Sequence, residues 1–483
     1  MTVARSAPSN SDVREDYAEF LQRHPGYGPG GVLDARRARD FARLDRSGEV
    51  YLDYTGGGLC AESLVREHAE LLSSRVFGNP HSQSPSSAAM TVHVDSARRA
   101  VLRHFGADPA EFVAIFTANA SAALKLVAES YPFARGSSFL LSYDNHNSVN
   151  GMREFAAARG TRVAYAPVCL PELGLDEAAL EALLDEPASD GDRLFAYPAQ
   201  SNFSGVLHPL EWAARARERG WDVLLDCAAF APTHTLELSA VPADFVSISF
   251  YKMFGYPTGV GALLARRSAL AKLRRPWFAG GTVSYAAVAK PRHDLLEGAE
   301  AFEDGTLNYL ALPAVEAGLN RLQEPYLEAI GARVMSLTAW TLERLCSLRH
   351  ANGRAVVRIY GPEGTRGRGG AIAFNLLDEH GGLIDHRLVE QHANEARISL
   401  RTGCFCNPGA GETALEISAE ELSHCFARTR RMTPDAFREC LPGKGSGAVR
   451  ISFGEASTFA DAHALVGLVE SLGAGERLRR VDR

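Results

Sequence analysis

One lysine stands where covalent chemistry is feasible. Lys252 lies in the run SFYKMFGYPTGVG, after an apolar strand-like segment and just before a glycine-rich turn. Its aromatic neighbours Tyr251 and Phe254 would take the amine partly out of water, which lowers the pKa of a lysine and makes it a nucleophile towards an aldehyde. The alternative is a surface lysine whose stem lies on apolar side chains while its amine reaches solvent.

A carboxylate precedes this lysine by one strand. Asp226 ends the run DVLLD, and aspartate is disfavoured in strands and costly to bury without a partner. A protonated pyridine nitrogen is one such partner, and the carboxylate makes that ring a better acceptor of electrons. The alternative is an aspartate that caps the following helix. Because Asp226 and Lys252 both come at strand ends of a parallel sheet, we expect them to face one crevice.

Other strand-to-helix junctions carry small or polar residues that suit an anionic, planar ligand. The stretch FTANASAALKLV places Ala120 and Ser121 where a helix begins and backbone N–H groups can bind phosphate, although a plain helix cap would look the same. His146 in SYDNHNSVNG could stack on a ring, unless it is structural. Asn202 in AYPAQSNFSG could donate to a phenolic oxygen, and Thr282 in FAGGTVS could contact a second phosphate oxygen.

Two cysteines stand close together in RTGCFCNPGAG, a run whose glycines and proline predict an exposed, mobile loop. Arg401 would favour a thiolate at Cys406, and a thiolate that takes up sulfur becomes a persulfide. Metal binding is the alternative for such a pair. Two cysteines without further cysteine or histidine at zinc-ligand spacing make a poor site, so we expect no metal. We interpret Cys404 as secondary.

The segments that would position these residues alternate between strand and helix. Runs such as FVAIFTA, SSFLLSY, RLFAYPA and DFVSISF are separated by helical stretches, which predicts a mainly parallel α/β sheet. After Thr306 a long helical stretch precedes the strands AVVRIYG, GAIAFNLL, ISLRTGC and AVRISFG, with a hairpin turn at TRGRGG. We expect a lead-in at 1–45 that packs on the small domain, a large cofactor-binding domain at 46–305, and a small α+β domain at 306–483 that carries the cysteine loop.

Composition narrows the function classes. The chain has 483 residues, 46% of them hydrophobic and 23% charged, and its formal net charge is −7. This is typical of a soluble globular protein and does not favour nucleic acid as a partner. No apolar run approaches the roughly 20 residues of a membrane span, and the first residues lack the apolar core of a secretory signal. Eight cysteines without framework spacing favour reduced thiols in the cytoplasm.

Taken together, these motifs resemble the class V, fold type I pyridoxal-phosphate enzymes of the cysteine desulfurase group. They are most similar to the N-terminal, desulfurase-like domain of molybdenum cofactor sulfurases. The resemblance covers residues from about 50 to 455 and rests on seven stretches in order: GNPHSQSPSS, FTANASAALKLV, DNHNSVNGMR, FAYPAQSNFSG, SFYKMFGYPTGVGAL, FEDGT and LRTGCFCNPGA. It implies the fold of that group, a central sheet with helices on both faces and a smaller C-terminal domain.

The resemblance also implies a role for each matching residue. Lys252 would hold pyridoxal 5′-phosphate as a Schiff base, Cys406 would receive sulfur, and Arg450 in GAVRISFG would clamp the substrate carboxylate with its bidentate guanidinium. His146 would stack on the cofactor ring and belong with Lys252 and Cys406 to the catalytic residues. The other cofactor contacts would be Asp226 on the ring nitrogen, Asn202 on the ring oxygen, and Ser121, Ser249 and Thr282 on the phosphate, with Thr282 given across a homodimer interface. Ala120 and Tyr251 would also contact the cofactor.

The sequence therefore predicts a pyridoxal-phosphate-dependent L-cysteine desulfurase, a sulfurtransferase. It would convert cysteine to alanine, leave a persulfide on Cys406 and supply an acceptor protein with sulfur. One alternative is a C–S lyase, epimerase or other class V enzyme that acts on a different amino acid without this persulfide. The other is a scaffold without activity.

Three features depart from the molybdenum cofactor sulfurases. Gly411 and Glu412 stand where a third cysteine is expected, and LDYTGGGL replaces a His-Ala-Gly-type run. The sequence ends at Arg483, soon after the strand AVRISFG, so we expect their C-terminal cofactor-binding domain to be absent. The desulfurase half is supported by the resemblance, and a molybdenum target is not.

Overall fold

Apolar runs flanked by glycine and polar turns form the strands of one seven-stranded sheet. The computed structural model describes residues 10–80, 82–187, 190–441 and 443–474. The strand order is β2-β10-β9-β8-β7-β3-β4, and only β10 runs antiparallel to its neighbours. The mainly parallel sheet is thereby confirmed. Its strands are β2 (Phe112–Thr117), β3 (Ser138–Ser142), β4 (Arg162–Ala166), β7 (Arg193–Pro198), β8 (Asp222–Asp226), β9 (Phe245–Ser249) and β10 (Gly261–Arg266).

Alternating side chains of these strands enter two separate hydrophobic cores, one on each face of the sheet. On β3, Leu140 belongs to one core while Phe139 and Leu141 belong to the other. The helices α6 (Ala120–Ser130) and α8 (Met152–Ala158) supply the second core. The opposite face packs on α5 (Pro85–His104), α10 (Trp212–Glu218) and α13 (Leu312–Arg321). Helices therefore cover both faces, as the two-residue period of a strand requires when both faces are buried.

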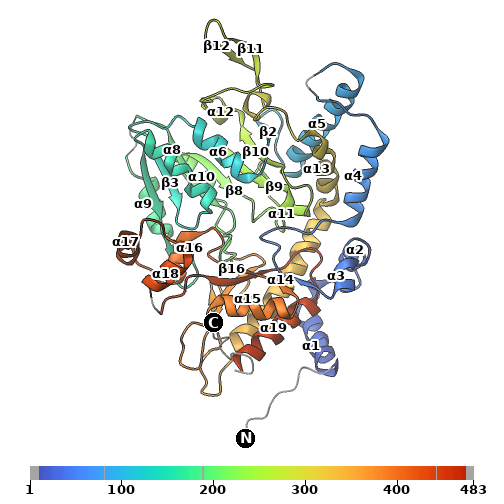
Figure 1. Ribbon diagram of the computed structural model, residues 1–483, viewed down its shortest axis with the longest axis vertical. Helices are drawn as coiled ribbons and strands as arrows, with labels where there is room; N and C mark the ends of the chain where they lie inside the picture. The colour runs from blue at the N-terminus through green and yellow to red at the C-terminus, as the bar shows by residue number, and fades with distance from the viewer. Residues whose placement is uncertain (1–9, 81, 188–189, 442, 475–483) are drawn as a thin grey trace.

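A second, antiparallel sheet lies below the first in Figure 1, in the order β13-β14-β17-β16. The predicted hairpin turn TRGRGG does join two antiparallel neighbours. The long helical stretch divides into two helices because Pro325 lacks an N–H and starts a new one. The elements are α14 (Glu324–Ser347), β13 (Val357–Tyr360), β14 (Ala371–Leu376), α15 (His386–Glu395), β16 (Arg401–Gly403), β17 (Ala448–Ser452) and α19 (Phe459–Gly473).

The lead-in segment forms α1 (Asn10–Arg23), α2 (Val32–Asp40) and α3 (Ala42–Ser47), and its first nine residues lie outside the described part of the chain. The ring of Phe20 lies 4.8 Å from that of Phe459 and 6.4 Å from that of Trp340, centroid to centroid. These contacts place α1 beside α14 and α19, as Figure 1 shows.

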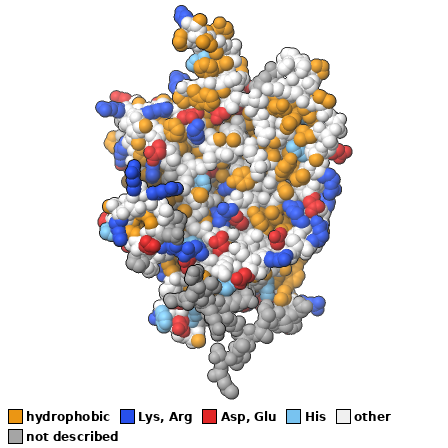
Figure 2. Space-filling view, in the orientation of Figure 1, with side chains coloured by type: hydrophobic (Ala, Val, Ile, Leu, Met, Phe, Trp, Pro, Cys, Tyr) orange, Lys and Arg blue, Asp and Glu red, His pale blue; other side chains and the backbone are white. Residues whose placement is uncertain are grey.

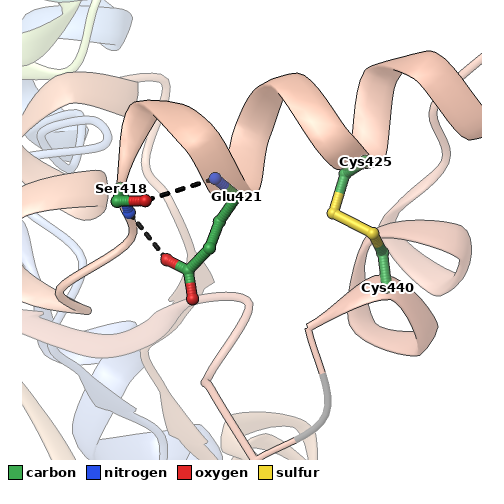
Figure 3. The surroundings of a disulfide bond; sticks show 4 residues. All are labelled: Ser418, Glu421, Cys425 and Cys440. Carbon is green, nitrogen blue, oxygen red and sulfur yellow. Dashed lines mark hydrogen bonds between the residues drawn. A yellow bond between two sulfur atoms is a disulfide. The ribbon is translucent and has the colours of Figure 1, made fainter.

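Two expectations from the sequence were wrong in detail. The run ISLRTGC is not one strand: β15 (Ile398–Ser399) pairs with β1 (Val50–Tyr51), and β16 pairs with β17. Eight free thiols were expected, but Cys425 on α17 (Ala419–Arg428) and Cys440 on α18 (Pro434–Cys440) form a disulfide with Cα atoms 5.7 Å apart (Figure 3). Their helices pack side by side, which the spacing of the cysteines in the sequence does not reveal.

A short hairpin of β11 (Val283–Ala287) and β12 (Arg292–Leu295) projects from the top of the molecule in Figure 1. Hydrophobic side chains gather on it in Figure 2, among them Val288, which is 98% exposed, and Tyr285. Within the described ranges, no helix is long and apolar enough to cross a membrane.

The aromatic contact between α1 and the C-terminal helices gives a first prediction. Phe20 is 1% exposed, so Phe20→Ala leaves a cavity and should lower the free energy of unfolding by about 3–5 kcal/mol in a denaturant titration. Phe426→Ala is the control, because that ring is 59% exposed and its removal should change the free energy of unfolding by less than about 0.5 kcal/mol. Equal effects of the two variants would contradict the packing described here.

Candidate active site

The carboxyl ends of β7, β8 and β9 meet the starts of α6 and α7 (Asn147–Asn150) around a cavity of about 220 Å³. Parallel strands present their carboxyl ends at one edge, so the polar residues that follow them converge there. Eight of the residues predicted for the cofactor lie together on its wall: Ala120, Ser121, His146, Asn202, Asp226, Ser249, Tyr251 and Lys252.

Lys252 enters the cavity from α11 (Phe250–Phe254), a one-turn helix that starts where β9 ends. The glycine-rich segment 56–58 packs closely against this helix, which the absence of side chains permits. Gly58 N–H donates to the Tyr251 carbonyl at 3.0 Å, and a Cβ at Gly58 would lie 3.0 Å from the Lys252 carbonyl oxygen. Burial lowers the pKa of Lys252 to about 8, against an opposing effect of Asp226. A substantial fraction of the amine is therefore neutral near physiological pH.

Asp226 is buried at the end of β8, and its carboxylate is oriented by its own strand and the next one. The Ser247 hydroxyl donates to Oδ1 at 2.8 Å, and the Ala228 N–H donates to the same oxygen at 3.1 Å. The second contact closes a turn. In the described residues 227–249, turns and then β9 follow β8, so the helix that Asp226 would have capped in the alternative is not there. In the described part of the chain both hydrogen bonds end on Oδ1, so Oδ2 remains for a ligand in the cavity.

The end of the cavity at α6 suits an anion. Asn119 caps this helix through Oδ1, which accepts the Ala122 N–H at 2.9 Å. The Ser249 hydroxyl is buried and has no hydrogen-bond partner among the described residues, although it lines the cavity. A buried hydroxyl is costly without a partner. Together with the helix N–H groups, it is the kind of donor that a phosphate would satisfy.

His146 is held in one orientation and one tautomer. Its Nδ1 accepts the Ser148 N–H at 3.1 Å and thereby caps α7, so the neutral ring carries its proton on Nε2. Burial lowers the pKa of His146, with smaller opposing and reinforcing effects from Asp226, Lys252 and Arg450. The residue is thus both a helix cap and a neutral, planar wall of the cavity.

Asn202 links the cavity to the smaller domain. Its Nδ2 donates to the Phe405 carbonyl at 2.5 Å, and its own carbonyl accepts from Arg450 Nη1 at 2.6 Å. Arg450, on β17, is 1% exposed, and burial lowers its pKa to about 10 although Asp53 opposes this. An amide nitrogen has two hydrogens, so Asn202 keeps one donor for a ligand in the cavity.

The cysteine loop was expected to be exposed, and only alternate residues of it are. Cys404 and Cys406 are exposed free thiols, while Phe405 and Asn407 are buried. The loop is docked on the large domain, because the Cys406 carbonyl accepts the N–H of Asn147 at 2.7 Å. Cys406 therefore lies beside the residue that follows His146, at the rim of the cavity.

The backbone of this loop is strained. Phe405 and Cys406 have φ values of 53° and 57°, in the left-handed region that side chains disfavour. A hydrogen bond next to the strained residues offsets this cost, because Asp144 Oδ1 accepts from Asn407 Nδ2 at 2.7 Å. The Ser201 hydroxyl donates to the same oxygen at 2.8 Å and so fixes the position of Asp144. Strain of this kind persists where the surrounding contacts over-determine the conformation.

Three polar residues of the cavity wall were not predicted from the sequence: Asp144, Ser148 and Gln200. Each lies two residues from a predicted residue, His146 or Asn202, which is the signal that was available. Three of the predicted residues lie outside the wall. Arg450, Cys406 and Thr282 are not part of its wall. The Thr282 hydroxyl donates to the Ala279 carbonyl at 2.8 Å. Within the described residues, no group of three or more His, Cys, Asp or Glu side chains is arranged to hold a metal ion.

The chain is similar to known proteins in sequence and in fold. Residues 50–465 match the family described as aminotransferase class-V. The molybdenum cofactor sulfurase of Bos taurus is 39% identical over 91% of the chain and 52% of its own length, and that of Arabidopsis thaliana is 38% identical over 92% of the chain and 59% of its own length. The chain thus spans about half the length of these relatives.

The fold also has solved counterparts. The apo structure of a cysteine desulfurase from Thermococcus onnurineus NA1 superposes with a TM-score of 0.74 at 24% identity, over 92% of this chain and 98% of that one. Similarity at this level establishes the fold, which agrees with the fold type I architecture expected from the sequence.

The lowered pKa of Lys252 predicts its reactivity. In cofactor-free protein, a small amine-reactive reagent should label Lys252 at a rate that rises with pH and is half-maximal near pH 8, because only the neutral amine reacts. Peptide mass spectrometry measures that rate. Asp226→Asn removes the charge that raises the pKa, so its midpoint should fall below that of the wild type.

The matched control is Asp294→Asn, an exposed carboxylate on the hairpin strand β12, which should leave the profile unchanged. A Lys252 profile that follows the exposed lysines in both variants would contradict burial as the cause.

Proposed function

The chain belongs to the aminotransferase class-V family, and on that premise we propose that it is a pyridoxal-phosphate-dependent L-cysteine desulfurase. One observation carries the proposal. A single cavity holds a lysine of lowered pKa and a buried carboxylate, and a free, exposed cysteine is docked at its rim through Asn147 and Asn202. A lyase or epimerase would use the lysine and the carboxylate without needing the docked cysteine.

The residues present fit pyridoxal phosphate. Ser249 has a buried hydroxyl that lacks a partner among the described residues, at the end of the cavity where the N–H groups of α6 can hold a phosphate. Asp226 keeps Oδ2 for the ring nitrogen, and His146 offers a neutral ring as a wall. When bound, the cofactor supplies an aldehyde for amines and a ring that accepts electrons.

Each of these side chains would then have a defined role. Lys252, with its pKa near 8, can hold the aldehyde and can take a proton from the substrate Cα. Asp226 holds a proton on the ring nitrogen through Oδ2. Arg450 donates to the substrate carboxylate, since its Nε is buried without a partner among the described residues.

Cys406 would receive the sulfur of the substrate. Its thiolate attacks the sulfur of the substrate, so the substrate C–S bond breaks and an S–S bond forms on the enzyme. The Cβ that loses sulfur gains a proton, which gives alanine, and no external oxidant or reductant is needed. The positive charges of Arg401 and Arg450 interact electrostatically with Cys406.

The partners of the reaction are part of the proposal. The persulfide would pass to an acceptor protein, and the name of the relatives makes the molybdenum cofactor one candidate for the final acceptor. We propose a cytoplasmic homodimer in which a second copy covers the exposed side chains of Trp277, Phe278, Tyr285 and Val288. Thr282 lies at the base of this hairpin and is 1% exposed in the single chain, so contact with the phosphate of the other copy would require its hydroxyl to leave the Ala279 carbonyl.

The direct test is chemical. The purified holoenzyme should contain one pyridoxal phosphate per chain, and with L-cysteine and a reductant it should release alanine and sulfide in equal amounts. Bound cofactor without alanine would reject cysteine as the substrate and favour the lyase or epimerase. Failure to bind the cofactor would favour a scaffold without activity.

The role of Cys406 gives a further prediction. Cys406→Ser removes the sulfur acceptor while Lys252 and Asp226 stay intact, so alanine formation should fall by about 10³-fold or more with the cofactor still bound. Cys404→Ser is the matched control on the same loop and should keep most of the activity. Wild-type turnover by Cys406→Ser would exclude the persulfide mechanism.

A further inference from the structure

Two arginines face each other across a pair of strands. Arg401 on β16 lies directly opposite Arg450 on the antiparallel strand β17. Like charges at directly opposite positions destabilise a sheet. Arg450 is also almost fully buried, which makes its charge costly unless a carboxylate compensates it.

Asp53 provides that carboxylate from a distant part of the chain. Arg401 Nε donates to its Oδ2 at 2.9 Å and Arg401 Nη2 donates to the same oxygen at 2.5 Å. Arg450 Nη2 donates to Oδ1 at 3.1 Å. Gly56 leaves room for this arrangement, because a Cβ there would lie 2.5 Å from Asp53 Oδ2 and 2.7 Å from Arg401 Nη2.

The two arginines differ in which N–H groups of the guanidinium are already hydrogen-bonded. Arg450 uses Nη1 on the Asn202 carbonyl and Nη2 on Asp53, while its Nε is buried and finds no acceptor within the described part of the chain. Arg401 presents both Nε and Nη2, one full edge of its fork, to Asp53. One amino-acid carboxylate can therefore be bound by Arg450, and Arg401 is already occupied.

Because Asp53 occupies Arg401, substrates that need a cation at the position of Arg401 should bind less well. The charge of Arg401 acts on Cys406, the residue that the substrate sulfur must reach, and its side chain is 50% exposed. An acidic group on the substrate Cβ, such as a sulfinate or a carboxylate, would lie near Cys406 and would need a cation there. Arg450 is committed to the α-carboxylate, so this cation would have to be Arg401, which Asp53 holds.

We propose that Asp53 is a specificity-determining residue that occupies half of a two-arginine anion site. With Asp53 in place, the site takes an amino acid with one carboxylate and a neutral β-substituent, a thiol or selenol. It disfavours an amino acid with a second acidic group on Cβ. This rests on the proposed function, and it narrows the substrate class of that same site.

The test measures binding by calorimetry, apart from turnover. The holoenzyme is titrated with L-alanine, which has one acidic group, and with L-aspartate and L-cysteine sulfinate, which have two. In Asp53→Asn, the side chain keeps its shape and loses its charge, so Arg401 is released. The affinity for the two diacids, relative to L-alanine, should rise by about tenfold or more, the range of one charge-assisted hydrogen bond.

The double variant Asp53→Asn/Arg401→Gln is the control. It lacks the released cation, so the gain in diacid affinity should disappear. Asp53→Ser serves as a second neutral variant if Asp53→Asn does not fold. An unchanged ratio of diacid to alanine affinity in a folded neutral variant, or a gain that persists without Arg401, would overturn the proposal.

Alanine release from L-cysteine is measured on the same wild-type preparation. Its absence would reject the desulfurase, whereas the affinity ratios report on Asp53 independently.

Discussion

A lysine amine withdrawn from water beside a carboxylate is the constraint on which the rest of this structure depends. Burial lowers the pKa of Lys252 to about 8, and Asp226 limits the shift. Both residues need a fixed position, and the sheet supplies it. Asp226 is paired with Ser247 in the register of β8 and β9, the Ser247 hydroxyl donates to its carboxylate, and Lys252 follows the end of β9 after one turn of helix. A shift of one residue in that register would turn Ser247 and Asp226 to opposite faces of the sheet and break this hydrogen bond.

The smaller domain brings the second half of the chemistry to this edge. Asn202 bonds both to Arg450 and to the Phe405 carbonyl, so its side chain and its carbonyl couple the cavity, Arg450 and the cysteine loop. The left-handed residues Phe405 and Cys406 hold the thiol outward while Phe405 stays buried. A docked loop of this kind positions Cys406 relative to Lys252 before any substrate arrives, which reduces the entropy cost of the reaction.

Much of the site could be predicted because its residues follow strands whose type and order are evident from the sequence. Lys252, Asp226, His146 and Asn202 stand at such ends, and they do converge. Contacts between segments far apart in the chain could not be predicted. Asp53 is 348 positions from Arg401, and nothing in LDYTGGGL indicates that its glycines make room for that pair. The burial of Asn407 and the Cys425–Cys440 disulfide likewise depend on tertiary packing that periodicity does not encode.

The most direct test of the central claim is a single turnover with L-cysteine that carries isotopically labelled sulfur. The holoenzyme is mixed with less than one equivalent of substrate, quenched without reductant and mapped by peptide mass spectrometry. The account predicts one labelled sulfur on Cys406 for each alanine formed. Alanine formed in equal amount with no label on Cys406 would contradict it.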